Sequence, residues 1–133
     1  MNSREIAHLD TRLQPLAREF LTRCKAAGVD AFITCTYRSR AEQAKLYAKG
    51  RTAPGPRVTN AAPGQSRHND TDAAGKPAST AFDIAIKNKD GSLNWNASSA
   101  AWKTAGSIGQ GLGLDWGGAW VRFKDAPHFQ LKK

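Results

Sequence analysis

A long polar stretch in the middle of the chain, residues 51–80, limits what the remaining residues can form. It consists mainly of Pro, Gly, Asn, Asp, Ser, Thr and Ala, and it offers little that could be buried. A loop of this length inside a compact domain is usually functional or mobile. The core must therefore come from the segments on either side. At 133 residues, we expect residues 1–133 to form one domain without a second module.

Two helices and a strand are predicted before this loop. "VDAFITCTY" is rich in β-branched and aromatic residues and predicts a buried strand. Ser39 and Glu42 form a capping box that opens a helix over "RAEQAKLYAK", which Gly50 closes. An amphipathic helix over residues 9–27, ended by Gly28, is predicted from one apolar face: Leu9, Leu13, Leu16, Phe20 and Cys24.

A strand, a helix and a terminal strand are predicted after the loop. "STAFDIAI" alternates so that Asp83 shares a face with Ala81 and Ala85. Asn96 can cap a helix over residues 97–108. The chain then passes through a glycine-rich segment to "VRFKDAPHFQL", which indicates a short strand. This order of elements predicts an α+β fold with a small antiparallel sheet flanked by helices.

The charge of the chain indicates an anionic partner. Lys+Arg 20 against Asp+Glu 11 gives a formal net charge of +9, which suits nucleic acid, an anionic membrane surface or an acidic cell wall. No RNP motif, Cys/His finger or recognition helix is present, so we expect no nucleic-acid partner. The first twenty residues carry charges throughout and no apolar run, which predicts neither a signal peptide nor a membrane span.

The cysteines and one histidine have ordinary interpretations. Cys24 and Cys35 are too few for a disulfide framework and fit no zinc ribbon, so we expect two reduced packing residues. His8 lies among charges near the start of the first predicted helix and indicates a solvated helix residue. Asp90, in "NKDGS", is typical of a turn acid.

The other two histidines lie beside loop-to-strand transitions. His68 and His128, with Asp83, would give the three nitrogen and oxygen ligands that a hydrolytic zinc site commonly uses, with a fourth position for water. A turn at Ala126-Pro127 could fold Asp125 back towards such a metal, where a carboxylate can carry protons. The alternative is that Asp125 caps a turn and His128 is a strand histidine.

The chain resembles the zinc-dependent peptidoglycan peptidases of the D-Ala-D-Ala carboxypeptidase and L-alanyl-D-glutamate endopeptidase type. The likeness is carried, in order, by "TYRSRAEQAKLYAKGRT", "SRH", "AFDIAI" and "GLGLDWGGAWVRFKDAPHFQ". The last segment is similar to the phage endolysin branch in particular. The resemblance implies a DD-peptidase or Hedgehog-like fold around one zinc site.

The resemblance also implies roles for individual residues. It implies that His68, Asp83 and His128 bind Zn²⁺ and that Asp125 is the catalytic base. The family motif, Ser-x-His-x-x-Gly-x-Ala-x-Asp, is shorter than the distance from Ser66 to Asp83, which implies an insertion close to "NDTDAAGK". Asp70 or Asp72, within it, could replace Asp83. We favour Asp83, because a strand holds a ligand better than a flexible loop does.

Three further positions are predicted to contact substrate. Arg38 carries over from the family as a catalytic and substrate-binding residue, because a guanidinium can grip a carboxylate or carbonyl oxygen with two hydrogen bonds. Ser66 lies at the start of the matching motif, and Trp120 could line the groove beside the metal. Trp116 and Tyr37 are open between core packing and substrate contact.

Together these observations predict a monomeric phage-type endolysin that cleaves the L-Ala–D-Glu bond of peptidoglycan. It would stay in the host cytoplasm until a holin-like protein releases it to the wall, and it would have no separate wall-binding domain. The alternatives are a D-Ala-D-Ala carboxypeptidase or dipeptidase, and a non-catalytic module that binds peptidoglycan.

Overall fold

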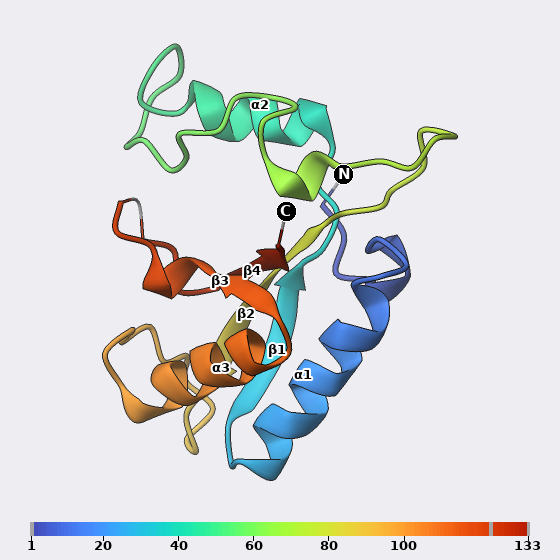
Figure 1. Cartoon of the computed structure of the whole chain (residues 1–133). Coiled ribbons are helices and arrows are strands. Elements are labelled where there is room, and N and C mark those ends of the chain that lie inside the picture. The colour runs from blue at the N-terminus through green and yellow to red at the C-terminus, as the bar shows by residue number, and fades with distance from the viewer. Residues whose placement is uncertain (1, 123, 133) are drawn as a thin grey trace.

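Four strands form one antiparallel sheet in the computed structural model, which describes residues 2–122 and 124–132 (Figure 1). The strand order is β1-β2-β4-β3, which confirms the predicted α+β fold with a small antiparallel sheet. In chain order the elements are η1 (Ile6–His8), α1 (Gln14–Ala26), β1 (Asp30–Cys35), α2 (Arg40–Ala48), η2 (Arg67–Asn69), β2 (Ala81–Lys87), α3 (Ala100–Gly111), β3 (Leu114–Trp116), η3 (Gly117–Ala119) and β4 (His128–Leu131).

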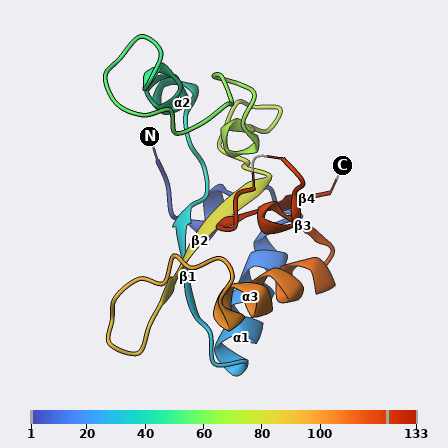
Figure 2. The same cartoon turned by 90° about the vertical axis from the view of Figure 1, so that its left-hand side faces the viewer.

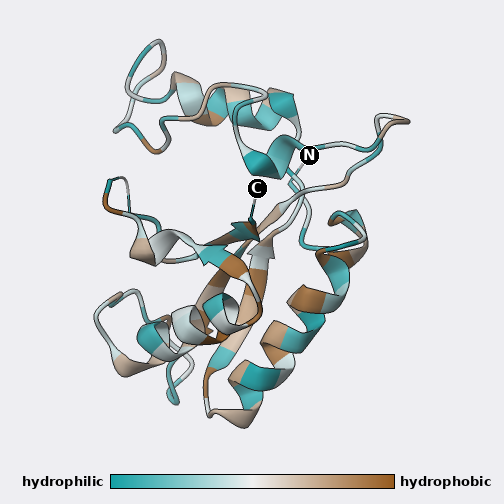
Figure 3. Ribbon diagram, in the orientation of Figure 1, coloured by the Kyte–Doolittle hydropathy of each residue, from teal (hydrophilic) through white to brown (hydrophobic). Residues whose placement is uncertain are grey.

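Helices α1 and α3 pack on one face of this sheet and form the core with it (Figure 2). Phe20 of α1 lies with its ring 5.5 Å from that of Phe82 and 4.8 Å from that of Phe129. All three side chains are fully buried. Figure 3 shows hydrophobic colour on the strands and on α1. Because side chains alternate along a strand, Asp83 points to the other face of β2.

Both long helices start later than predicted. The apolar face of the first was correct, but α1 begins at Gln14 because Asp10 forms a separate turn, in which its carboxylate accepts from the Arg12 N–H. For α3 the cap is Ser99, whose hydroxyl accepts from the Trp102 N–H. Asn96 instead accepts from the Ser98 N–H in a preceding turn. A local turn competes with the helix at both starts.

The strand predictions need two corrections. β1 was predicted to be buried, but it is an edge strand paired with β2 alone, and Cys35 is its one buried residue. The C-terminal segment is a strand only from His128, and its Phe123 lies outside the described residues. The glycine-rich segment before it contains β3, which was not predicted and pairs with β4.

Residues 36–78, here called the loop region, form the upper part of Figure 1, and no described residue of it joins the core cluster. Its helix α2 begins at the predicted cap, where Ser39 accepts from the Glu42 N–H. The buried side chain of α2 is Gln43, a polar residue. Hydrogen bonds hold the region together: Arg51 Nη1, for example, donates to the carbonyls of Tyr47 and Thr59.

Within the described residues, no helix combines the length and the apolar character that crossing a bilayer requires.

Candidate metal centre

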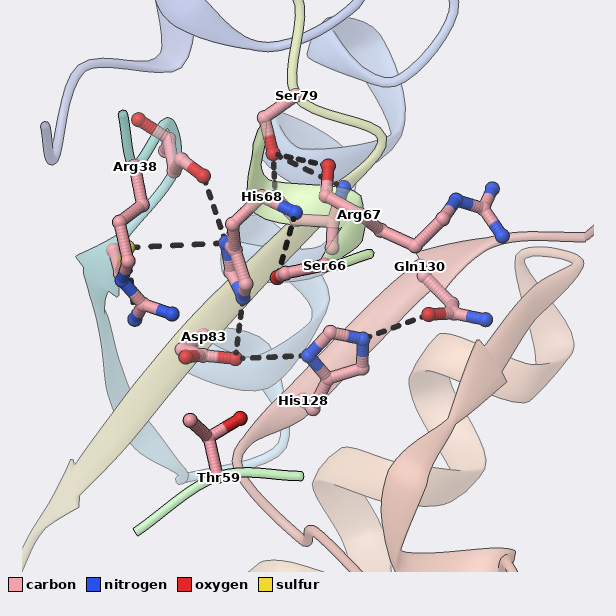
Figure 4. Close-up of polar contacts among 12 residues, drawn as sticks. Arg38, Thr59, Ser66, Arg67, His68, Ser79, Asp83, His128 and Gln130 are labelled. Atoms are coloured by element: carbon pink, nitrogen blue, oxygen red, sulfur yellow. Dashed lines mark hydrogen bonds and ion pairs between the residues drawn. The ribbon is translucent and has the colours of Figure 1, made fainter. Parts of the chain in front are cut away.

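The three predicted ligands meet at one point above the sheet (Figure 4). Asp83 Oδ1 lies 3.2 Å from His68 Nε2 and 3.2 Å from His128 Nδ1. The β2–β4 register places Asp83 directly opposite His128. His68 comes from η2, where the Ser66 hydroxyl accepts from its N–H. One ligand atom from each of the three residues lies within 4.8 Å of the others.

Hydrogen bonds orient both imidazole rings. His68 Nδ1 lies 2.8 Å from the Thr36 carbonyl, which can only accept, so this nitrogen carries the proton. When the ring is neutral, its Nε2 keeps a lone pair that points towards Asp83. His128 Nε2 lies 2.8 Å from Gln130 Oε1, and donation there leaves the Nδ1 lone pair for the centre. Such partners are how proteins fix the tautomer of a metal-binding histidine.

His68 Nε2 is a buried nitrogen without a hydrogen-bond partner among the described residues. Its contact with Asp83 Oδ1, over 3.2 Å, is an ion pair. An unpaired buried polar atom is costly. A divalent cation between His68, Asp83 and His128 would satisfy it, and two nitrogens with one carboxylate oxygen suit zinc. The residues therefore fit a metal.

The charges of His68, Asp83 and His128 shift the protonation equilibria of His68 and Asp83. Burial alone would lower the pKa of His68, but the Asp83 carboxylate raises the pKa to about 10. Burial alone would raise the pKa of Asp83, but His68 and His128 hold that pKa well below its usual range. Metal-free, the cluster thus keeps an imidazolium beside a carboxylate. Because a metal binds neutral imidazole, its binding would release that proton.

Asp125 reaches the same site through the predicted turn. Ala126 and Pro127 form this turn, which the bond from the His128 N–H to the Asp125 carbonyl closes. The Asp125 N–H donates to the Gly117 carbonyl over 3.0 Å. A Cβ at position 117 would collide with the Asp125 carbonyl oxygen, so this approach requires glycine. Burial and the charge of Asp83 raise the pKa of Asp125.

Trp116 holds this turn through a hydrogen bond to Ala126. Its indole Nε1 donates to the Ala126 carbonyl over 2.7 Å. Its ring lies 6.4 Å from the ring of Phe129 and directly against Gly106. Of the two interpretations left open for Trp116, the structure therefore favours packing.

One cavity of about 230 Å³ joins the predicted site residues. The Trp120 ring forms part of its wall and lies 5.3 Å from the His128 ring. All seven residues predicted for the site line this cavity: Arg38, Ser66, His68, Asp83, Trp120, Asp125 and His128.

Arg38 enters the cavity with neutral partners. Its Nη1 donates to Gln43 Oε1 over 3.1 Å and its Nε to Asn2 Oδ1 over 3.2 Å, while Nη2 lies 3.6 Å from Cys35 Sγ. No described carboxylate forms an ion pair with it. Its charge, which also acts to lower the pKa of Asp125, is therefore available to a substrate.

The sequence did not reveal several residues that hold the site. Gln43 and Gln130 bind site residues, and the Thr36 carbonyl binds a ligand ring. Cys35 is buried and free as predicted, but its Sγ also lies 3.8 Å from His68 Nδ1. The one available signal was the position of Gln130, which follows His128 by two residues and so shares its strand face.

The alternative acids lie outside the cluster. The Asp70 carboxylate accepts from the Thr80 hydroxyl, and Asp72 accepts from the N–H groups of Ala74 and Lys76. Asp72 thereby closes a small hairpin whose ends, Thr71 and Pro77, form an antiparallel bridge. This hairpin contains most of the expected insertion and points away from the sheet in Figure 1.

Two other residues also lie apart from the site. His8 belongs to η1, before α1, and lies 2.6 Å from the Ser3 hydroxyl. Asp90 accepts from the Ser92 N–H and hydroxyl, which confirms the predicted turn acid.

Comparison with known proteins gives the family. Residues 59–131, which include all three candidate ligands, match the peptidase M15 family model described as D-alanyl-D-alanine carboxypeptidase. The chain belongs to this peptidase family. It is 37% identical over 130 residues to the peptidoglycan L-alanyl-D-glutamate endopeptidase CwlK of Bacillus subtilis, covering 90% of this chain and 73% of CwlK. The prediction of a metal-dependent peptidase is thereby confirmed.

Two solved structures share the M15 fold with this chain. The L-Ala D-Glu endopeptidase ChiX of Serratia marcescens matches with a TM-score of 0.62 at 21% identity, covering 96% of this chain and 83% of ChiX. The LD-carboxypeptidase LdcB matches with a TM-score of 0.66 at 16% identity, covering 92% of this chain and 58% of LdcB. At these identities the likeness concerns the fold.

Proposed function

We propose that this M15 peptidase is a zinc enzyme that hydrolyses the L-Ala–D-Glu bond of peptidoglycan stem peptides. The observation that carries the proposal is the convergence of His68, Asp83 and His128 in one cavity with Asp125. The choice of bond is supported by the identity to CwlK, whose name states that activity.

In this mechanism His68, Asp83 and His128 hold the metal. Zn²⁺ held by these residues would supply a water with a pKa of about 7 and would polarise the scissile carbonyl. Asp125 accepts the proton of the attacking water and returns it to the leaving amine nitrogen. Its raised pKa suits the first transfer, because the carboxylate is then a better proton acceptor than an ordinary aspartate.

Arg38 and Trp120 position the substrate in the same mechanism. The Arg38 guanidinium, free of any described carboxylate, would donate to an oxygen of the acidic peptide. Gln43 and Asn2 fix its direction from the side away from the cavity. Trp120 would cover the His128 ring and limit the access of bulk water to the reacting atoms. Ser66 would act by holding His68 in place.

Mass spectrometry of digested peptidoglycan tests the proposal. Purified wall fragments are incubated with the protein, and the products are analysed together with the metal content of the protein. We expect new N-terminal D-glutamate and about one zinc per chain. The His128→Ala variant is the matched control and should give neither. Soluble products without a new D-glutamate terminus would contradict the proposed bond.

A D-Ala-D-Ala carboxypeptidase is the second candidate, because the matching family model carries that description. The same ligands and base would serve it. The same digest distinguishes the two, since this activity would release free D-alanine and leave the L-Ala–D-Glu bond intact.

We further propose that the enzyme is a monomeric phage endolysin that lyses the host after a holin-like protein opens the membrane. The similarity of "GLGLDWGGAWVRFKDAPHFQ" to the endolysin branch supports this role, and the net charge of +9 suits an acidic wall. Gram-negative cells that express the protein in the cytoplasm provide the test. We expect lysis when the inner membrane is permeabilised and none before. Lysis without permeabilisation would contradict the role of the holin.

A further inference from the structure

A second hollow continues the catalytic cavity on one side. Its volume is about 460 Å³, and three of its lining residues, Ala61, Trp120 and Asp125, also line the catalytic cavity. The two spaces therefore form one groove with Asp125 at the junction. A peptide with its scissile bond at the metal centre would extend past Asp125 into this hollow.

Two exposed cations lie in the walls of the hollow. Arg57 comes from the loop region and Lys124 from the segment before Asp125. Neither makes a hydrogen bond or an ion pair with any described residue. Asp125 is the one acidic residue among the described lining residues. Arg51 differs, because its guanidinium donates to two carbonyls and lies 3.9 Å from the centre of the Tyr47 ring.

The wall that carries Arg57 is held by part-buried hydrogen bonds. Gln43, with no exposed surface, donates from Nε2 to the Ala61 carbonyl over 2.8 Å. Arg51 donates to the Thr59 carbonyl over 3.2 Å. The opposite wall is held where the Asp125 N–H donates to Gly117. The backbone close to each cation, at Thr59 and Ala61 on one wall and at Asp125 on the other, is thus held before a ligand binds, which lowers the entropic cost of binding.

The order of groups along the proposed substrate indicates what these cations would bind. Asp125 would protonate the leaving nitrogen, which belongs to D-glutamate. In a stem peptide that residue continues through its side-chain carboxyl, so its α-carboxylate is free. This carboxylate is attached to the carbon that bears the leaving nitrogen. It must therefore lie close to Asp125, on the leaving-group side of the groove.

We infer that Arg57 and Lys124 form a carboxylate subsite that binds the free α-carboxylate of the D-glutamate released by cleavage. The inference rests on the proposed function and adds a determinant of substrate choice to it. The subsite favours stem peptides with D-glutamate over those in which the carboxylate is amidated to D-isoglutamine. The two cations also offset the repulsion between this carboxylate and Asp125.

A pair of substrates tests the subsite. The L-Ala-γ-D-Glu-L-Lys peptide and its D-isoglutamine twin differ in one charge. For Arg57→Ala and Lys124→Ala, we expect kcat/KM on the glutamate peptide to fall about threefold more than on its twin, and for the double variant about tenfold more. Arg57→Lys should recover part of the difference. Lys25→Ala, which removes an exposed cation of α1, is the matched control and should change neither value.

Salt provides a second readout. The preference of the wild type for the glutamate peptide should shrink between 0.05 and 0.5 M salt by roughly the factor that the double variant loses, because exposed charges are screened. Equal losses on both peptides, or no loss, would overturn the subsite while cleavage at L-Ala–D-Glu continues. If the wild type left this bond intact in both peptides, the proposed function would fail, and the subsite with it.

Discussion

The loop region and the rest of the chain are held together in different ways, and the candidate metal centre takes residues from both. Outside the loop region, α1, α3 and the sheet bury apolar side chains such as Phe20, Phe82 and Trp102. In the loop region the buried side chain of α2 is Gln43, which is held by hydrogen bonds. The sheet is held by apolar packing, whereas the loop region is held by polar contacts. The candidate metal centre lies at the boundary between them.

His68 is the candidate ligand that comes from the loop region. It belongs to the loop region, while Asp83 and His128 belong to the sheet. Its carbonyl accepts from the Arg38 N–H over 2.8 Å, and its ring binds the Thr36 carbonyl. A metal bound here would therefore tie the loop region to the sheet.

Removal of the metal should have the largest effect. Excess chelator is expected to reduce activity to background and to lower the melting temperature, because metal binding is coupled to folding. Amide hydrogen exchange should accelerate more in residues 59–69 than in β2, whose bonds to β1 and β4 do not need the metal. Added zinc should reverse both changes. Full activity in excess chelator would exclude a metal-dependent reaction.

Replacement of the proposed base, Asp125, should have the second-largest effect on activity. Asp125→Ala should lower kcat by about 10² to 10⁴, the usual effect of losing a general base. Bound zinc should stay near one per chain, because the three ligands and the backbone bonds of the turn remain. Steady-state kinetics and metal analysis of the same preparation check both points. Loss of zinc together with activity would make Asp125 a ligand.

A substitution in the core should lower the stability of the protein more than its activity. Phe20→Ala removes a fully buried ring that contacts two other aromatic rings. We expect the free energy of unfolding to fall by about 3–5 kcal/mol, as for other large-to-small core changes. Urea titration of the zinc-loaded protein measures this loss. A change below 1 kcal/mol would show that the ring is not packed as described.

The Gln43 side chain provides the contrasting test in the loop region. Gln43→Ala removes a buried amide that accepts from Arg38 and donates to Ala61. The free energy of unfolding should fall by about 1–3 kcal/mol, the cost of leaving buried polar groups unpaired. The KM for the stem peptide should rise, because Arg38 and the groove wall lose their support.

Gln43→Glu separates these two contacts. It keeps an acceptor for Arg38 but cannot donate to the Ala61 carbonyl. Stability would then fall while Arg38 stays in place, so KM should rise less than in Gln43→Ala. An equal rise of KM in both variants would show that the effect comes from the lost bond to the Ala61 carbonyl in the groove wall and not from Arg38.

Structural features set by neighbouring residues could be predicted from the sequence, whereas those set by contacts between distant residues were predicted less well. The capping box of Ser39 and the apolar face of α1 follow from neighbouring residues. The start of α3 was misplaced because Asn96 and Ser99 can both cap a helix. β3 was missed because it has three residues and exists through its pairing with β4, which lies further along the chain.

The candidate site shows the same division. His68, Asp83 and His128 could be proposed from residue types and a family likeness, and the structure brings them together. Apart from Gln130, the groups that orient them could not be proposed. Thr36 lies 32 positions from His68, and its carbonyl is a backbone atom common to every residue type. Such a contact has no sequence signal until the fold is known.

The hairpin between Thr71 and Pro77 should matter least. In one variant, residues 72–76 are replaced by Asn-Gly, which favours a tight hairpin turn, and Asp70 is changed to Asn to keep an acceptor for the Thr80 hydroxyl. The free energy of unfolding should change by less than about 1 kcal/mol, since loop length has a weak effect. Zinc should stay near one per chain, whereas the matched Asp83→Asn variant should lose it. Zinc loss in the hairpin variant would return the second ligand to Asp70 or Asp72.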